Sequence, residues 1–160
     1  IEKKLCTDKE VVFVVVGATA GEYGKQVEDV FSGSENRILR FPTQKYGDLA
    51  EFYQAADLAV FPRQCSLSFY DVQACGLPVV FEDNNINMDR AAHGNGLCFA
   101  AENIADFREK LEQMMNMPEA EYQKMRQNSI AFIAEGYSYD MIARQYTDIL
   151  EKEYRRFYNQ

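Results

Sequence analysis

Short runs of β-branched residues alternate with longer amphipathic stretches along most of this chain. The first run, Val11 to Val16, is apolar at every position, which is typical of a strand buried on both faces of a parallel sheet. Such strands, separated by segments of helical length, indicate a doubly wound parallel α/β fold. Because no internal repeat or linker interrupts the pattern, the sequence predicts one α/β domain over residues 1–160.

The same pattern predicts five strands. After the first run we expect strands at Arg37–Phe41, Leu58–Phe61, Pro78–Phe81 and, more weakly, Gly96–Phe99. The first four should pair in parallel within one sheet, because segments of helical length separate them. The residues before Val11 resemble the end of a helix. We therefore expect that a preceding strand is missing and that the chain is a piece of a longer enzyme.

Helices are expected between the strands and after the last one. Apolar residues at helical spacing place the earlier helices around residues 26–31, 46–56 and 69–75. Three more should follow, with Asn103 and Ser138 as N-terminal caps and Pro118 in a first turn. Gly76 should end the helix before it in a left-handed conformation. The Phe and Tyr residues at helical spacing are interpreted as core.

Composition excludes several functional classes. The chain has 25 acidic and 17 basic residues, a net charge of −8, whereas nucleic-acid binders need clustered basic residues. The longest apolar run is far shorter than the roughly 20 residues that span a bilayer. A cytoplasmic protein without a membrane span is therefore expected, with any membrane contact through the missing part. Four scattered cysteines fit reduced thiols: Cys6, Cys65, Cys75 and Cys98.

Ligands in doubly wound folds bind beyond the carboxyl ends of the strands. The first loop there, GATAGEYG, is rich in glycine, but Thr19 occupies the second glycine position of a dinucleotide-binding loop. A Walker lysine is absent as well, which excludes a P-loop NTPase. The loop is either a tight turn or a ligand contact, and the sequence leaves both interpretations open.

The third loop offers groups suited to a nucleotide. Ser66 and Ser68 precede a short helix, where free backbone N–H groups and the helix dipole favour a phosphate. Arg63 could add a charge-assisted contact, and Asp71 on the first turn could accept hydrogen bonds from ribose hydroxyls. Alternatively, the serines cap the helix and Asp71 complements its dipole. The residues alone favour capping.

Several motifs resemble those of one enzyme family. FPRQCSLSFYDVQACGLPVV at residues 61–80 is similar to the donor-binding signature of the group 1 retaining glycosyltransferases, which have the two-domain GT-B fold. FYQAADLAVFP at 52–62 and YSYDMIA at 137–143 resemble two further motifs in the same order. The resemblance implies the Rossmann-like half that binds a nucleoside-diphosphate sugar. Metal-independent transfer would go to an acceptor held by a missing N-terminal domain.

The resemblance also implies which residues bind the donor, and it favours binding over capping. The third loop is about three residues shorter than the family pattern, and Arg63 lies near the position of an expected acidic residue. We interpret it as a variant in which Gln64, Ser66 and Ser68 replace the usual contacts. The base should lie near the end of the second strand, because the two loops leave neighbouring strands. The donor-binding residues implied are Phe41, Pro42, Arg63, Gln64, Ser66, Leu67, Ser68 and Asp71.

Other residues receive weaker assignments. Asp89 aligns with a family glutamate, but Asx-turns explain its Asn-rich loop equally well. His93 is interpreted as a surface turn residue, and the catalytic histidine of the family belongs to the absent domain. No catalytic residue, metal or cofactor is therefore expected in residues 1–160, which should fold but transfer no sugar.

Two alternative functions remain. A non-catalytic nucleotide-binding or regulatory α/β module is one, although a receiver would need acidic residues where Gly17 and Phe61 stand. A degenerate transferase that binds nucleotide without turnover is the other, because Arg63 has the opposite charge to the family residue. The sequence specifies neither the sugar, the base nor the acceptor.

Overall fold

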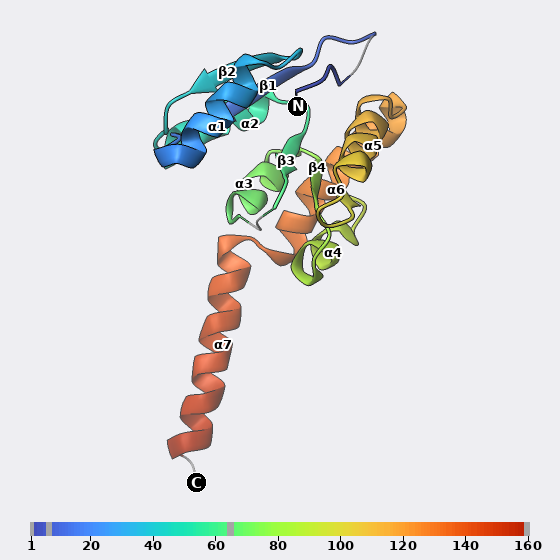
Figure 1. Cartoon of the computed structure of the whole chain (residues 1–160). Coiled ribbons are helices and arrows are strands. Elements are labelled where there is room, and N and C mark those ends of the chain that lie inside the picture. The colour runs from blue at the N-terminus through green and yellow to red at the C-terminus, as the bar shows by residue number, and fades with distance from the viewer. Residues whose placement is uncertain (1, 6–7, 64–65, 159–160) are drawn as a thin grey trace.

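The computed structural model describes residues 2–5, 8–63 and 66–158, which alternate strands and helices as an α/β fold (Figure 1). The strands are β1 (Val12–Val16), β2 (Arg37–Phe41), β3 (Ala59–Phe61), β4 (Val79–Glu82) and β5 (Gly96–Phe99). The helices are α1 (Gly21–Ser32), the 3₁₀ helix η1 (Tyr46–Asp48), α2 (Leu49–Ala55), α3 (Ser68–Ala74), α4 (Asn85–Ala91), α5 (Ile104–Met115), α6 (Glu119–Gly136) and α7 (Tyr139–Tyr158). The predicted fold class is confirmed.

All described strand pairs are parallel, as predicted, but they form two sheets. β1 pairs with β2, and β3, β4 and β5 form a second sheet in that order. The expectation of one sheet, with the second and third strands as neighbours, is therefore wrong. Apolar composition favours burial of a strand but does not specify which strand pairs with which edge. β3 has only three residues and pairs with β4, not with β1.

β1 is also less buried than its composition predicts. Val12 and Val14, which lie on one face of the strand, are 37% and 45% exposed. Phe13, on the opposite face, packs against the cluster that contains Leu5 and Val80. The strand is thus covered on one face by the described residues, and the expectation of burial on both faces is wrong. Its sheet has two strands, β1 and β2.

The strand β4 lies at the centre of the core. Val79 and Phe81 point toward α3 and α6 in one cluster of buried side chains, whereas Val80 points the opposite way toward α5 in another. The side chains of a strand alternate between its two faces, so β4 is covered by helices on both sides. This is the double winding that the sequence predicts. It gives α3 a rigid base.

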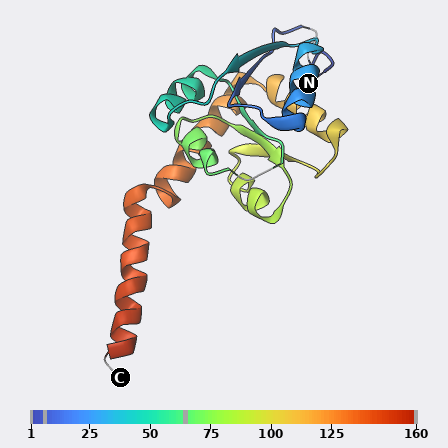
Figure 2. The same ribbon diagram turned by 60° about the vertical axis from the view of Figure 1, so that its left-hand side comes forward.

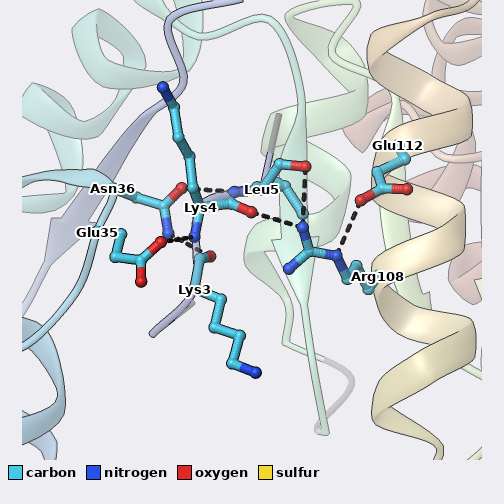
Figure 3. Close-up of polar contacts among 7 residues, drawn as sticks. All are labelled: Lys3, Lys4, Leu5, Glu35, Asn36, Arg108 and Glu112. Carbon is cyan, nitrogen blue, oxygen red and sulfur yellow. Dashed lines mark hydrogen bonds and ion pairs between the residues drawn. The ribbon is translucent and has the colours of Figure 1, made fainter. Parts of the chain in front are cut away.

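The amino-terminal segment connects the two sheets (Figure 3). The backbone N–H groups of Lys4 and Leu5 donate to the side chains of Glu35 and Asn36, just before β2, at 3.1 and 2.9 Å. From the other side, the Arg108 guanidinium of α5 donates to the carbonyl oxygens of Lys4 and Leu5. Leu5 itself is buried in the core. These contacts join β2 to the helix layer over β4 and β5.

Predicted helix ends are largely confirmed. Asn103 accepts a hydrogen bond from the backbone N–H of Asp106 at 3.1 Å, and Ser138 accepts one from Met141 at 3.3 Å. Gly76 has the expected left-handed conformation, with φ of 71°. Pro118 lies one residue before α6 rather than in its first turn. At residues 46–56 a 3₁₀ turn precedes a shorter α-helix. Two further expectations are wrong: α1 begins at Gly21 rather than around residue 26, and α4 is a helix in a stretch expected to be a loop.

Helix α7 extends away from the rest of the chain in both views (Figure 1 and Figure 2). No residue of this helix is buried, and its apolar side chains at helical spacing are open to solvent. The helix therefore forms as predicted, but its apolar face has no cover among the described residues. None of the helices in the described residues is both long and apolar enough to cross a membrane.

Candidate functional site

The loops that follow β2 and β3 meet at one hydrogen bond. The hydroxyl of Tyr46, at the start of η1, donates to Oδ1 of Asp71 on α3 at 2.7 Å. The two residues lie 25 positions apart in sequence, and their preceding strands belong to different sheets. The loop with the predicted base contacts and the helix with the predicted ribose contact are therefore adjacent, although their strands are not neighbours.

The start of α3 satisfies its own backbone. The N–H of Ser68 donates to Oγ of Ser66 at 3.2 Å, and those of Phe69 and Tyr70 donate to the carbonyl oxygens of Ser66 and Leu67. The expectation that N–H groups are free here is wrong for these three residues, because a short turn closes over them. Ser66 thus has the helix-start role that the sequence offered as the alternative to phosphate binding.

Buried polar contacts anchor α3 to the body of the protein. The fully buried amide of Gln73 donates to the carbonyl of Leu77 at 2.8 Å and accepts from Nδ2 of Asn95 at 2.6 Å. Arg90 of α4 lies 4.6 Å from the centre of the Phe69 ring, near enough for a cation–π contact. A helix held in this way keeps Asp71, on its outward side, in a defined place.

Asp71 is half-buried, and Tyr46, which contacts it, is 66% exposed. The pKa of Tyr46 is raised, first because its hydroxyl donates to Asp71 and then because of a hydrogen bond with Tyr139 at the start of α7. A phenol of ordinary pKa is already protonated at neutral pH, and the raised pKa means that Tyr46 stays a donor at more alkaline pH as well. Tyr139, Tyr46 and Asp71 form a chain of contacts from α7 to α3.

The side chains of two other predicted residues of the third loop, Arg63 and Leu67, are more exposed to solvent than that of Asp71. Arg63 has a side chain that is 82% exposed and pairs with Glu102, in the loop after β5, at 3.9 Å. Leu67 is 81% exposed. Gln64 lies outside the described residues. The recorded ion pair thus directs Arg63 toward the β5 loop.

The aromatic ring of Phe41, at the end of β2, is partly covered by another ring. Phe41 is 36% exposed and packs edge-on against Phe52 of α2, with ring centres 5.0 Å apart. The carbonyl of exposed Pro42 accepts from the Gln44 side chain at 2.8 Å. The N–H of Gly17 donates to the carbonyl of Phe41 at 3.0 Å, so the glycine-rich loop begins beside this ring.

The glycine-rich loop borders an open hollow of about 360 Å³. Gly21 has φ of 66°, a left-handed conformation that favours glycine. At Gly24 a Cβ would lie 3.0 Å from the carbonyl carbon of Thr19, so close approach of the loop requires glycine there. Both glycines have a structural reason, which supports the tight-turn interpretation and leaves ligand contact untested. The hollow is lined by Thr19, Ala20, Gly21, Gly24, Lys25, Glu28 and Asp29.

In the fourth loop, an asparagine side chain caps a helix. Oδ1 of Asn84 accepts from the backbone N–H groups of Ile86 and Asn87 and so caps α4. Asp89 is exposed on that helix. His93 is an exposed turn residue whose ring lies 4.8 Å from that of Phe132, which confirms its interpretation as a surface residue. Among the described residues, no cluster of His, Cys, Asp and Glu could hold a metal ion.

Sequence reasoning assigned no site role to three residues at this site. Tyr46 falls in a stretch predicted only as a helix start. Tyr139 lies in the family-like motif at 137–143 but received no site role, and Glu102 lies in a surface loop after the fifth strand. Tyr46 contacts Asp71, Tyr139 contacts Tyr46, and Glu102 contacts Arg63. Each contact spans 25 or more positions, and no spacing rule links such distant residues. An aromatic residue soon after a strand end is the one local signal that could have suggested Tyr46.

Comparison with known proteins identifies related sequences and folds. A family model described as "Glycosyl transferases group 1" matches residues 2–132. A comparison with curated proteins finds no match.

Three solved structures have similar folds at low sequence identity. Sucrose-phosphate synthase from Thermosynechococcus elongatus superposes with a TM-score of 0.76 at 16% identity over 89% of this chain. WaaG, a glycosyltransferase involved in lipopolysaccharide biosynthesis, gives 0.64 at 17% over 84%. The catalytic domain of starch synthase IV from Arabidopsis thaliana, bound to ADP and acarbose, gives 0.60 at 16% over 80%. The matches span only 38%, 36% and 28% of those chains, respectively.

Proposed function

This chain belongs to the group 1 glycosyltransferases, and from that premise we propose that it is the donor domain of such an enzyme. It binds a nucleoside-diphosphate sugar, and the sugar is transferred to an acceptor held by another part of the protein. The meeting of the β2 and β3 loops at Asp71 is the observation that carries the proposal. It brings a carboxylate suited to ribose hydroxyls beside the loop proposed for the base.

In this proposal each part of the donor has its own residues. Asp71 accepts hydrogen bonds from the ribose hydroxyls, and the base lies against Phe41 and Pro42. The diphosphate lies at the third loop near Arg63, with Gln64, Ser66, Leu67 and Ser68 completing the site. The backbone N–H groups of α3 are occupied, so side chains carry more of the phosphate binding than the sequence suggested.

Arg63 must leave Glu102 to reach a phosphate. The pair is exposed on both sides, and its atoms are 3.9 Å apart, so it adds little stability and opens readily. A freed guanidinium can form paired hydrogen bonds with phosphate oxygens. It would stabilise the negative charge that develops on the departing diphosphate, which is the electrostatic part of glycosyl transfer. In this proposal transfer needs no metal and retains the configuration of the sugar.

Catalytic groups and the acceptor site are proposed to lie outside residues 1–160. Positioning of the donor then becomes the task of this domain. A cytoplasmic location is part of the proposal, supported by the free thiols of Cys75 and Cys98. A second candidate, a domain that binds nucleotide without turnover, is favoured by the basic residue Arg63 in place of the family's acidic one.

Titration of the intact protein with ADP, GDP and UDP tests the proposal by calorimetry in the presence of EDTA. Saturable binding of at least one nucleotide is expected without a divalent metal, because Arg63 is proposed to pair with the charge of the diphosphate. Absence of binding by all three would overturn the proposal. Release of sugar from the matching nucleotide sugar then separates an active transferase from a domain that only binds.

A further inference from the structure

Water can satisfy the hydrogen bonds of an exposed tyrosine hydroxyl. A direct hydrogen bond from such a hydroxyl to a carboxylate is therefore worth explaining. Tyr46 is 66% exposed, yet its hydroxyl lies 2.7 Å from Oδ1 of Asp71. A hydrogen bond to an ionised acceptor is stronger and shorter than one between neutral groups. Within the described residues it is the one recorded hydrogen bond of the Asp71 side chain. The orientation of this carboxylate therefore depends on Tyr46.

The contact leaves the carboxylate able to bind a ligand. An ionised carboxylate has about four acceptor positions on its two oxygens, and Tyr46 takes one of those on Oδ1. Ribose hydroxyls can then approach Oδ2 and the remaining position of Oδ1. An Asp side chain without such a partner samples several rotamers, and binding would have to select one of them at an entropic cost.

We propose that Tyr46 is a positioning residue of the donor site, whose hydroxyl holds the Asp71 carboxylate in the orientation that accepts ribose hydroxyls. The inference rests on the proposed function, in which Asp71 is the ribose acceptor. Tyr46 acts through Asp71 rather than by touching the reacting atoms. The second tyrosine, Tyr139, contacts Tyr46 and so supports the hydroxyl from the start of α7.

Substitution Tyr46→Phe in the intact protein tests the proposal, because it removes the hydroxyl and keeps the ring. The probe is whichever of ADP, GDP and UDP binds most tightly, titrated by calorimetry. Affinity should fall roughly three- to tenfold, the cost of ordering one side chain. Tyr146→Phe is the matched control, since Tyr146 is equally exposed, at 67%, and lies on α7. It should leave the affinity unchanged.

Two further titrations separate positioning from a general structural role. With the 2′,3′-dideoxy form of the same nucleotide, Tyr46→Phe should have no effect, because the ribose hydroxyls are absent. In the Asp71→Ala protein, Tyr46→Phe should likewise cause no further loss. Equal losses for both nucleotides, or additive losses in the double variant, would overturn the proposal, as would tighter binding by Tyr46→Phe.

The same measurements distinguish failure of this inference from failure of the proposed function. If Asp71→Ala weakens binding and Tyr46→Phe does not, the positioning role is wrong while the ribose assignment stands. If Asp71→Ala leaves the affinity unchanged, the ribose assignment itself is wrong and the role of Tyr46 falls with it. Melting curves for every variant show whether a lost affinity reflects a lost fold.

Discussion

The carboxylate of Asp71 is held by a side chain 25 positions earlier in the chain. On its own helix, Asp71 has a second favourable interaction, since it lies in the first turn of α3 near the positive end of the dipole. Asp71 thus has two possible roles, one in the stability of α3 and one in ligand binding. The two roles can be separated experimentally, because each predicts a different effect of the same substitution.

Asp71→Ala should reduce donor affinity far more than stability. Loss of hydrogen bonds to a charged group costs on the order of 1.5–3 kcal/mol, or roughly a tenfold or greater fall in affinity. The dipole contribution is only about 0.3–1 kcal/mol, so the fold should survive. Calorimetric titration and melting curves of both proteins decide the matter. Unchanged affinity with a lowered melting temperature would assign Asp71 to the helix end alone.

Cys98 provides a prediction about pH. Burial, followed by the charge of Asp83, raises the pKa of the Cys98 thiol from 9.0 to about 11. The folded protein therefore keeps this proton where the unfolded chain loses it. The stability contributed by the neutral thiol is complete below pH 9 and is lost as pH rises toward about 11.

Alkylation rates measure this pKa directly in a variant that keeps Cys98 as its single cysteine. Since the thiolate is the reactive form, the rate in the folded protein should rise with a midpoint near pH 11. The same variant in denaturant is the control and should titrate near 9.0. A folded-state midpoint at the unfolded value would contradict the prediction.

Among the secondary-structure elements, α3 matters most for the site, and its position depends on a polar anchor. Gln73 is fully buried and links Leu77, after the helix, to Asn95, before β5. The helix has only seven residues, too few for stability on its own. Tertiary contacts therefore set the direction in which Asp71 points.

Gln73→Leu should destabilise the protein by about 1–3 kcal/mol, because the buried Nδ2 of Asn95 and the carbonyl of Leu77 lose their partner. Urea unfolding measures the change. Gln127→Leu, at an exposed position of α6, is the matched control and should stay within about 0.5 kcal/mol. Equal effects of the two substitutions would show that the buried amide contributes nothing.

Across the chain, separate contacts connect the two sheets. The segment Lys3–Leu5 links the start of β2 to α5, and Phe13 of β1 packs on the cluster around Val80. The Tyr46–Asp71 hydrogen bond adds a further connection on the side of the candidate site. The relative placement of the base loop and the ribose helix thus depends on how these sheets meet.

Residues 1–160, expressed alone, should fold and bind a nucleotide but transfer no sugar. The described residues form two clusters of buried side chains around β4, whereas the acceptor and the catalytic groups are proposed to lie elsewhere. A cooperative melting curve, combined with an assay for sugar release from ADP-, GDP- and UDP-glucose, tests both parts. Measurable sugar transfer by residues 1–160 alone would contradict the proposal that the catalytic groups lie outside them.

Local interactions account for what could be predicted from the sequence. The caps at Asn103 and Ser138 and the left-handed Gly76 depend on neighbours within three or four positions, so residue type and spacing suffice to identify them. The parallel α/β class follows in the same way from the apolar periodicity of runs such as Val11–Val16. The motif at residues 61–80 identified the family from an unbroken stretch of chain.

Tertiary structure alone decided how these parts meet. The apolar pattern of a strand predicts which of its faces is buried but not which strand edges pair. The separation of β1 and β2 from β3, β4 and β5 into two sheets therefore could not be predicted. The contact of Tyr46 with Asp71 joins loops of different sheets, and it depends on the packing of both. The backbone of Ser68 was expected to be free, yet a turn through Ser66 closes on it. In each case a hydrogen-bonding group could pair with several partners. Which partner it contacts depends on which lies close in the folded structure and not on separation along the sequence.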